Sequence, residues 1–245
     1  MCEICGVPRA THRPLIGRRQ ALALSLGVVA TLAAPLGAFP KTKEPPKPQN
    51  AISPEQALAR LKEGNSRYVH GLARRHDFVA EREILVGGQN PYAGILSCAD
   101  SRVAPEYAFD SGRGDLFVCR VAGNFANPDN VASFEFAVDV LKTPLILVLG
   151  HESCGAIKAA ISSIQEKSTL PGHLPSLVSA LSPAVEAVAN APGDLLVNAT
   201  NENVRRNVAA LKSASPILSA AVAEKRLTVV GGVYRLATGQ VEMIA

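Results

Sequence analysis

Pro144 to Gly150 (P-L-I-L-V-L-G) is the segment that most restricts the fold, because it contains no polar side chain. A strand that is apolar at every position is buried on both faces, which is typical of inner strands in parallel sheets covered by helices. The segment therefore predicts an α/β fold. The sequence G-H-E-S-C-G-A at 150–156 then places a histidine and a cysteine three positions apart, directly after this strand.

The remaining pattern alternates between predicted strands and predicted helices. Apolar runs predict further strands at 93–98, 114–121 and 227–234, and helical spacing predicts helices at about 54–63, 130–141, 155–165, 175–190, 194–213 and 216–225. Ser53 is a predicted helix cap, and Gly64 a predicted helix end. We expect a mostly parallel four-stranded sheet, flanked by helices, with an antiparallel edge strand formed by V-E-M-I after the A-T-G-Q turn.

The N-terminal segment has the pattern of a targeting sequence. Arg18 and Arg19 precede an apolar stretch that is rich in alanine and ends in small residues near Ala38. This pattern predicts a signal peptide of the twin-arginine type at 1–38, followed by a linker rich in proline and lysine at 39–51. We expect export to the periplasm, with no membrane association after cleavage. The alternatives are an uncleaved membrane anchor and a cytoplasmic protein.

Charge and cysteine content exclude two classes of protein. The net charge is +4, of which residues 1–38 carry +3, so the folded part has only about +1 and no basis for binding nucleic acid. Cys2 and Cys5 fall in the predicted signal peptide. The three cysteines that remain, an odd number, argue against a disulfide framework, and Cys119 is expected in the core.

Polar side chains gather after two of the predicted strands. Cys98, Asp100 and Arg102 follow the first strand in S-C-A-D-S-R-V, and His151 and Cys154 follow the third. If these strands are neighbours, all five side chains meet at the carboxyl edge of the sheet, where ligands bind in open α/β folds. Two thiolates and an imidazole suit zinc, and three protein ligands leave a fourth position for water, as in catalytic sites.

Other interpretations of these residues remain open at this point. His151 and Cys154 could act as an acid/base–nucleophile pair, the cysteines could simply pack in the core, and Asp100 and Arg102 could form a surface ion pair of little energetic value.

The two motifs resemble the zinc signatures of β-class carbonic anhydrases. The resemblance continues through G-D-L-F-V-C-R-V-A-G-N, N-E-N-V-R-R-N-V-A-A-L and G-G-V-Y-R-L-A-T-G-Q-V-E, and it covers nearly all of residues 52–245. It implies that 52–245 is a zinc catalytic domain with strand order 2-1-3-4. The implied activity is the reversible hydration of carbon dioxide to bicarbonate and a proton by a zinc-bound hydroxide, with one Zn²⁺ per subunit.

The resemblance also implies roles for individual residues. Cys98, His151 and Cys154 would ligate zinc. Asp100 would accept a hydrogen bond from the zinc-bound water, and Arg102 would hold Asp100 in place. The implied substrate-binding residues are Gln89, Phe117, Phe136 and Val103. Gln89 would act across a subunit interface in a homodimer or higher oligomer.

The sequence departs from the family pattern at Ala99 and at Glu152–Ser153, none of which is an implied ligand. Three rival functions stay open. The chain could be a carbon disulfide or carbonyl sulfide hydrolase on the same scaffold, a zinc-holding protein without catalytic activity, or a thiol redox protein that uses Cys98 and Cys154.

Overall fold

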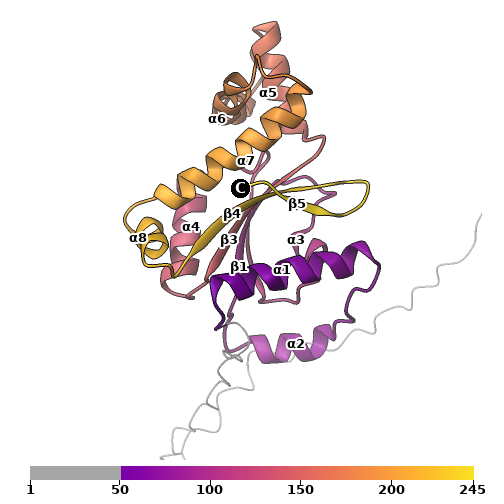
Figure 1. Ribbon diagram of the computed structural model, residues 1–245, viewed down its shortest axis with the longest axis vertical. Coiled ribbons are helices and arrows are strands. Elements are labelled where there is room, and N and C mark those ends of the chain that lie inside the picture. Colours follow the sequence, from indigo (N-terminus) through magenta and orange to yellow (C-terminus); the bar gives the residue numbers. More distant parts are fainter. Residues whose placement is uncertain (1–50) are drawn as a thin grey trace, which may run out of the picture. The chain divides into compact units, whose positions relative to one another are not determined.

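The structure, a computed structural model, describes residues 51–245, and its centre is one five-stranded sheet (Figure 1). The strand order is β2-β1-β3-β4-β5, with β1 to β4 parallel and β5 antiparallel to β4. The predicted fold class, strand order and edge strand are therefore confirmed. The predicted signal peptide at 1–38 and all but the last residue of the linker at 39–51 lie outside the described residues.

Single helices separate the first three strands, and four consecutive helices separate the third strand from the fourth. The strands are β1 (Ala93–Ser97), β2 (Leu116–Arg120), β3 (Leu145–His151), β4 (Thr228–Tyr234) and β5 (Val241–Met243). The helices are α1 (Pro54–Val69), α2 (Phe78–Leu85), α3 (Pro105–Ala108), α4 (Pro128–Asp139), α5 (Gly155–Glu166), α6 (Leu174–Ala187), α7 (Leu195–Ser213) and α8 (Ile217–Ala223).

The helices cover both faces of the sheet, so β1 and β3 are buried at every position. On one face, Ile146 and Val148 pack with apolar residues of α4, α7 and α8. On the other face, Leu145, Leu147 and Leu149 pack with residues of α1 and α3. This two-sided burial explains why the segment P-L-I-L-V-L-G needs no polar position.

A third apolar cluster lies at the carboxyl end of the strands. It joins residues of α5, α6 and α7, including Ile157 and Leu181, to Cys98 and Cys154. The strand-end cysteines therefore lie in an apolar environment that these three helices close from one side.

Helix α1 is longer than predicted. Ser53 caps it as expected, since its hydroxyl accepts from the Gln56 amide and its own amide donates to the Gln56 side chain. The helix does not end at Gly64 but continues to Val69, so the predicted stop is wrong. Gly64 instead marks the point where α1 passes close to α3, because a Cβ placed there would lie 2.0 Å from the carbonyl oxygen of Phe109.

Helix α2 was missed in the sequence because it has no buried residue and so no apolar face against the core. Its start is nevertheless encoded locally, since the Asp77 carboxylate accepts from the amides of Val79 and Ala80. Among the described residues, no helix has both the length and the apolar character needed to cross a membrane.

We predict that Gly64→Ala destabilises the fold. Helix propensity alone would favour alanine by about 1 kcal/mol. The overlap with the Phe109 backbone outweighs this gain, because overpacking typically costs about 1–3 kcal/mol and a clash with backbone atoms lies at the upper end of that range. Gly155→Ala is the matched control, because a Cβ at Gly155 meets no atom within 4 Å. Urea unfolding of both variants tests the prediction, and equal stability of the two would contradict it.

Candidate functional site

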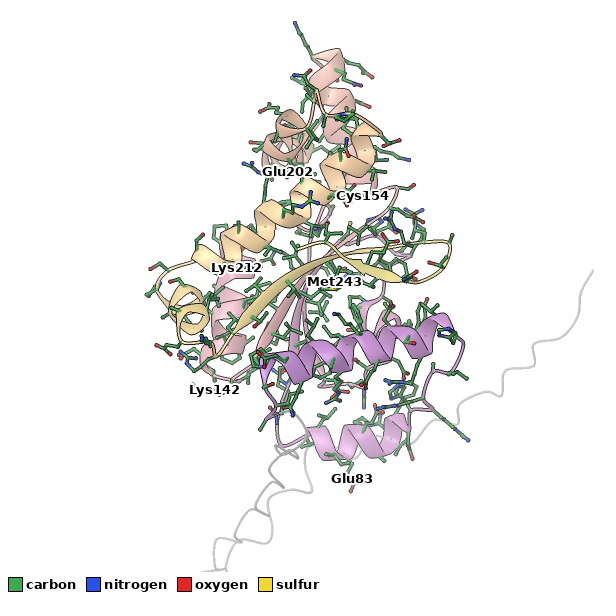
Figure 2. All side chains as sticks on the ribbon, in the orientation of Figure 1. Glu83, Lys142, Cys154, Glu202, Lys212 and Met243 are labelled. Carbon is green, nitrogen blue, oxygen red and sulfur yellow. The ribbon has the colours of Figure 1, made fainter. Side chains whose placement is uncertain are left out.

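The predicted ligands converge because β1 and β3 are adjacent and in register. Ser97 is paired with Leu149, so Cys98 and His151 leave the sheet at the same edge. The donor atoms of Cys98, His151 and Cys154 all lie within 4.8 Å of one another, and all three residues are buried. In Figure 2, Cys154 lies where α5 begins, far from Glu83 on α2.

Cys98, His151 and Cys154 form what we call the metal cluster, and its geometry fits a tetrahedral metal ion. With zinc–sulfur bonds of ~2.3 Å, tetrahedral geometry separates two sulfur ligands by roughly 3.8 Å, and the two Sγ atoms lie 4.0 Å apart. Imidazole Nδ1 of His151 lies 2.9 Å from the Glu152 carbonyl oxygen, to which it donates, so Nε2 carries the lone pair. Nε2 is buried and has no hydrogen-bond partner. Because a buried polar atom without a partner is costly, this nitrogen is suited to bind a cation.

The two thiols form a long hydrogen bond, with 4.0 Å between the sulfur atoms, and they ionise unequally. The hydrogen bond from Cys154 lowers the pKa of Cys98 well below its usual range. The hydrogen bond to Cys98, followed by burial, raises the pKa of Cys154 well above its usual range. The amides of Ile157 and Ala156, in the first turn of α5, act in the opposite direction on Cys154. One thiolate forms readily, and the second needs a nearby positive charge.

Asp100 and Arg102 form a bidentate pair beside the cluster. Nε of Arg102 lies 2.9 Å from Oδ1 of Asp100, and a terminal nitrogen lies 2.7 Å from Oδ2. This hydrogen bonding holds the pKa of Asp100 far below its usual range, so the carboxylate is ionised at neutral pH. Its Oδ2 also lies 3.8 Å from Nε2 of His151, which places a fixed negative charge at the edge of the metal cluster.

Arg120, at the end of β2, supports the loop that carries Cys98 and Asp100. Its guanidinium donates to the carbonyl oxygens of Cys98, Asp100 and Val103 at 2.8–3.0 Å. Sequence reasoning missed this residue, because its three acceptors are backbone atoms that leave no trace in the amino-acid pattern.

Glu152 fixes the second motif to the β4–β5 hairpin. Its carboxylate accepts from the amides of Leu236 and Ala237, at 2.6 and 3.3 Å. Its own amide donates to the Tyr234 carbonyl. The departure from the family pattern at this position therefore has a structural role, which is to hold the carbonyl that accepts from His151.

Three of the four predicted substrate-binding residues, Gln89, Phe117 and Phe136, lie away from the metal cluster of their own chain. Val103 follows the Asp100 loop and is fully buried in the cluster beneath α1 and α3. Phe117 is paired with Gly94, near the amino end of β1, and Phe136 is 48% exposed on α4. Gln89 is exposed and precedes β1, whereas Cys98 follows it, so the strand separates them.

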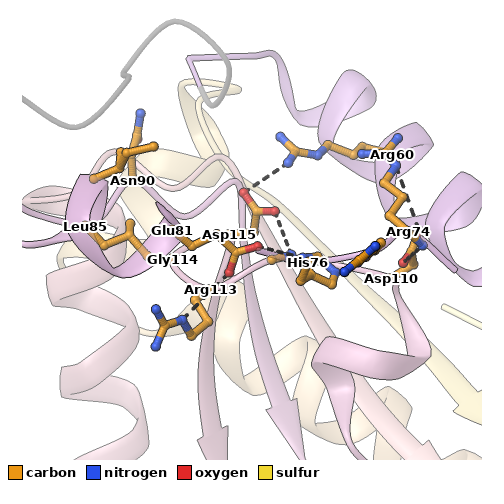
Figure 3. Close-up of a pocket in the computed structure, with 13 residues that line it drawn as sticks. Arg60, Arg74, His76, Glu81, Leu85, Asn90, Asp110, Arg113, Gly114 and Asp115 are labelled. Carbon is orange, nitrogen blue, oxygen red and sulfur yellow. Dashed lines mark hydrogen bonds and ion pairs between the residues drawn. The ribbon is translucent and has the colours of Figure 1, made fainter. Parts of the chain in front are cut away.

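A cavity of about 300 Å³ lies away from the metal cluster, beside the start of β2 (Figure 3). Polar side chains line it in pairs: Arg60 with Asp115 at 3.0 Å, and His76 with Glu81 at 2.8 Å. None of the predicted site residues lines this cavity, and it lacks the thiol and imidazole donors of the strand-end cluster.

Comparisons with known proteins agree on one family. The family model described as carbonic anhydrase matches residues 93–241. A carbonic anhydrase of Mycolicibacterium smegmatis is 38% identical over 192 residues, which are 78% of this chain and 93% of that protein.

Two solved structures share the fold. The β-carbonic anhydrase CcaA is 30% identical with a TM-score of 0.58, over 77% of this chain and 98% of that one. A tetrameric β-carbonic anhydrase of Sordaria macrospora is 24% identical with a TM-score of 0.61, over 78% of this chain and 98% of that one.

We predict that Cys98→Ser lowers zinc affinity by at least roughly 100-fold, because loss of a direct ligand exceeds the loss typical of supporting residues. Cys119→Ser is the matched control, since Cys119 is buried but lies outside the cluster. Metal content after dialysis against a weak chelator measures the effect. Equal zinc retention by the two variants would exclude Cys98 as a ligand.

Proposed function

This chain belongs to the β-class carbonic anhydrase family, and from that premise we propose that it hydrates carbon dioxide reversibly through a zinc-bound hydroxide, with one zinc per subunit. The observation that carries the proposal is the convergence of two sulfurs and an unpartnered imidazole nitrogen within 4.8 Å, beside an ionised carboxylate. Zinc held by Cys98, His151 and Cys154 would lower the pKa of a coordinated water enough to form hydroxide near neutral pH.

The residues around the metal position have separate tasks. Asp100 would accept a hydrogen bond from the attacking oxygen and orient its lone pair, and the two contacts from Arg102 keep the carboxylate aimed and ionised. Because Arg102 donates to both carboxylate oxygens of Asp100, these oxygens are committed to the pair rather than to the metal position.

Two of the three rival functions, zinc storage and thiol redox chemistry, lack a role for this carboxylate. A zinc-storage site needs neither Asp100 nor Arg102. A thiol redox protein has no use for a buried imidazole whose Nε2 lacks a hydrogen-bond partner. Carbon disulfide or carbonyl sulfide hydrolysis would use the same centre. Parallel assays with the three substrates separate these reactions.

We predict that Asp100→Asn lowers the rate of carbon dioxide hydration by roughly 100-fold or more, the usual scale for loss of a positioned acid–base group. The asparagine side chain has the same shape as that of aspartate, but its NH₂ group donates a hydrogen bond where the carboxylate accepts one. The substitution also removes the negative charge that pairs with Arg102. Zinc content should stay at one per chain. Stopped-flow hydration and metal analysis test this, and full activity with bound zinc would remove Asp100 from the mechanism.

We also propose that the functional unit contains at least two chains. Phe136 on α4 and Val140, directly after the end of that helix, are 48% and 57% exposed, and on α2 Phe78 and Val79 are 59% and 66% exposed. Contact with a second copy would bury such apolar surface. It would also let Gln89, which lies before the amino end of β1, reach the metal site of the partner.

Mixing two inactive variants tests this arrangement. Cys98→Ser lacks a metal ligand, and we expect Gln89→Ala to lose substrate binding. If Gln89 serves the partner subunit, a mixed dimer contains one site in which both residues are intact. We therefore predict that each mixed dimer, formed by dissociation and reassociation, recovers half of the activity of an unmutated dimer, so an equimolar mixture that pairs at random recovers about a quarter. No recovery, with mixed dimers detected by mass spectrometry, would place Gln89 outside the partner's site.

We further propose that the chain is exported by the twin-arginine route, on the basis of Arg18, Arg19 and the apolar stretch after them. Changing both arginines to lysine should leave the protein in the cytoplasm, because this route reads the arginine pair. Cell fractionation followed by activity assay measures the outcome. A periplasmic fraction that is unchanged in the double variant would contradict the proposal.

A further inference from the structure

Two asparagines of α7 are buried in the protein core, although asparagine is usually exposed to solvent. Asn203 and Asn207 are 2% and 8% exposed, one turn apart on the helix face that packs against the sheet. Burying amide side chains is costly unless their hydrogen bonds are made. Their partners therefore indicate what this helix face is built to hold.

The partners belong to the turn that follows β2. Nδ2 of Asn203 donates to the Gly123 carbonyl at 2.8 Å, and Oδ1 of Asn207 accepts from the Ala126 amide at 2.7 Å. The two asparagines are also joined, because Nδ2 of Asn207 donates to the carbonyl and to Oδ1 of Asn203, at 2.8 and 3.0 Å. One connected amide pair thus holds the turn at two points.

The same turn delivers a hydrogen bond to a predicted metal ligand. The Gly123 amide lies 3.3 Å from Sγ of Cys98, to which it donates. Gly123 has φ of +87°, a conformation open to glycine, and a Cβ there would lie 2.8 Å from the Leu181 side chain. Glycine has many accessible conformations, so an external contact must select the one that points its amide at the sulfur.

We propose that Asn203 and Asn207 are positioning residues for the metal centre, which act through the Gly123 amide on the sulfur of Cys98. An amide that donates to a thiolate withdraws electron density from the sulfur and reduces the charge that the sulfur donates to the metal. In a site with two thiolates, this contact preserves the acidity of the metal. The inference rests on the proposed function, because it assumes that Cys98 ligates the ion.

Cobalt(II) substitution gives a direct readout, because the sulfur-to-cobalt charge-transfer band reports electron density on the sulfur. Asn203→Ala should move this band to longer wavelength and weaken metal retention by roughly 10- to 100-fold, as for other residues that support ligands. Asn207→Ala removes the contact to Ala126 but leaves that to Gly123, so a smaller shift in the same direction is expected. Asn207→Ala also keeps the inference testable if Asn203→Ala does not fold.

Thr200→Val is the matched control on the same helix. Thr200 is 4% exposed, and its hydroxyl donates within the helix to the Leu196 carbonyl at 2.7 Å. This variant should lose stability without any change in the band. If the charge-transfer band of both asparagine variants lies at the same wavelength as that of Thr200→Val, the inference is overturned. The asparagine pair would then have a purely structural role. Absence of a thiolate band in the unmutated protein would instead refute the proposed metal centre itself.

Discussion

Parallel pairing between β1 and β3 is the constraint on which the rest of the site depends. The register sets Ser97 beside Leu149, so the two chain segments leave the sheet together. Cys98 follows one strand at once, and His151 ends the other. A shift of this register by one residue would turn the side chains of one strand to the opposite face relative to the other, so Cys98 and His151 would no longer meet. The metal cluster is therefore a consequence of strand order and register rather than of a dedicated loop.

Burial makes this cluster suited to a cation. The two thiols lie in the apolar cluster formed with α5, α6 and α7, and the imidazole beside them is buried as well. Their one mutual hydrogen bond lowers the pKa of Cys98 and raises that of Cys154, so the two sulfurs cannot both ionise easily without a positive charge between them. A divalent ion removes this conflict and also provides a partner for Nε2 of His151.

A second layer of contacts comes from elements distant in the sequence. Arg120 holds the carbonyls of the first motif, Glu152 ties the second motif to the β4–β5 hairpin, and α7 reaches the turn after β2 through Asn203. Each contact involves a backbone group of the partner segment. The ligands are thus fixed from three sides, which suits a site whose geometry must stay constant while substrate exchanges.

The sequence by itself determined the α/β class, most of the strands and helices, and the identity of the clustered residues. Local patterns carry this information, because an apolar run such as P-L-I-L-V-L-G and a polar motif after it are both properties of neighbouring residues. The likeness of the motifs to one family supplied the strand order, which no single segment encodes. Gly64 was misread as a helix end, because glycine has the same local signal whether it ends a helix or permits a close approach to Phe109.

Only the tertiary structure decided how the site is supported and which predicted residues lie away from it. The contacts of Arg120 and Asn203 end on carbonyl oxygens, and every residue has a carbonyl, so no pattern of side chains could reveal them. Phe117 lies away from the cluster because its partner in the sheet is Gly94, near the amino end of β1. These facts depend on distances between segments far apart in the chain, which are set when the sheet and its helices pack together.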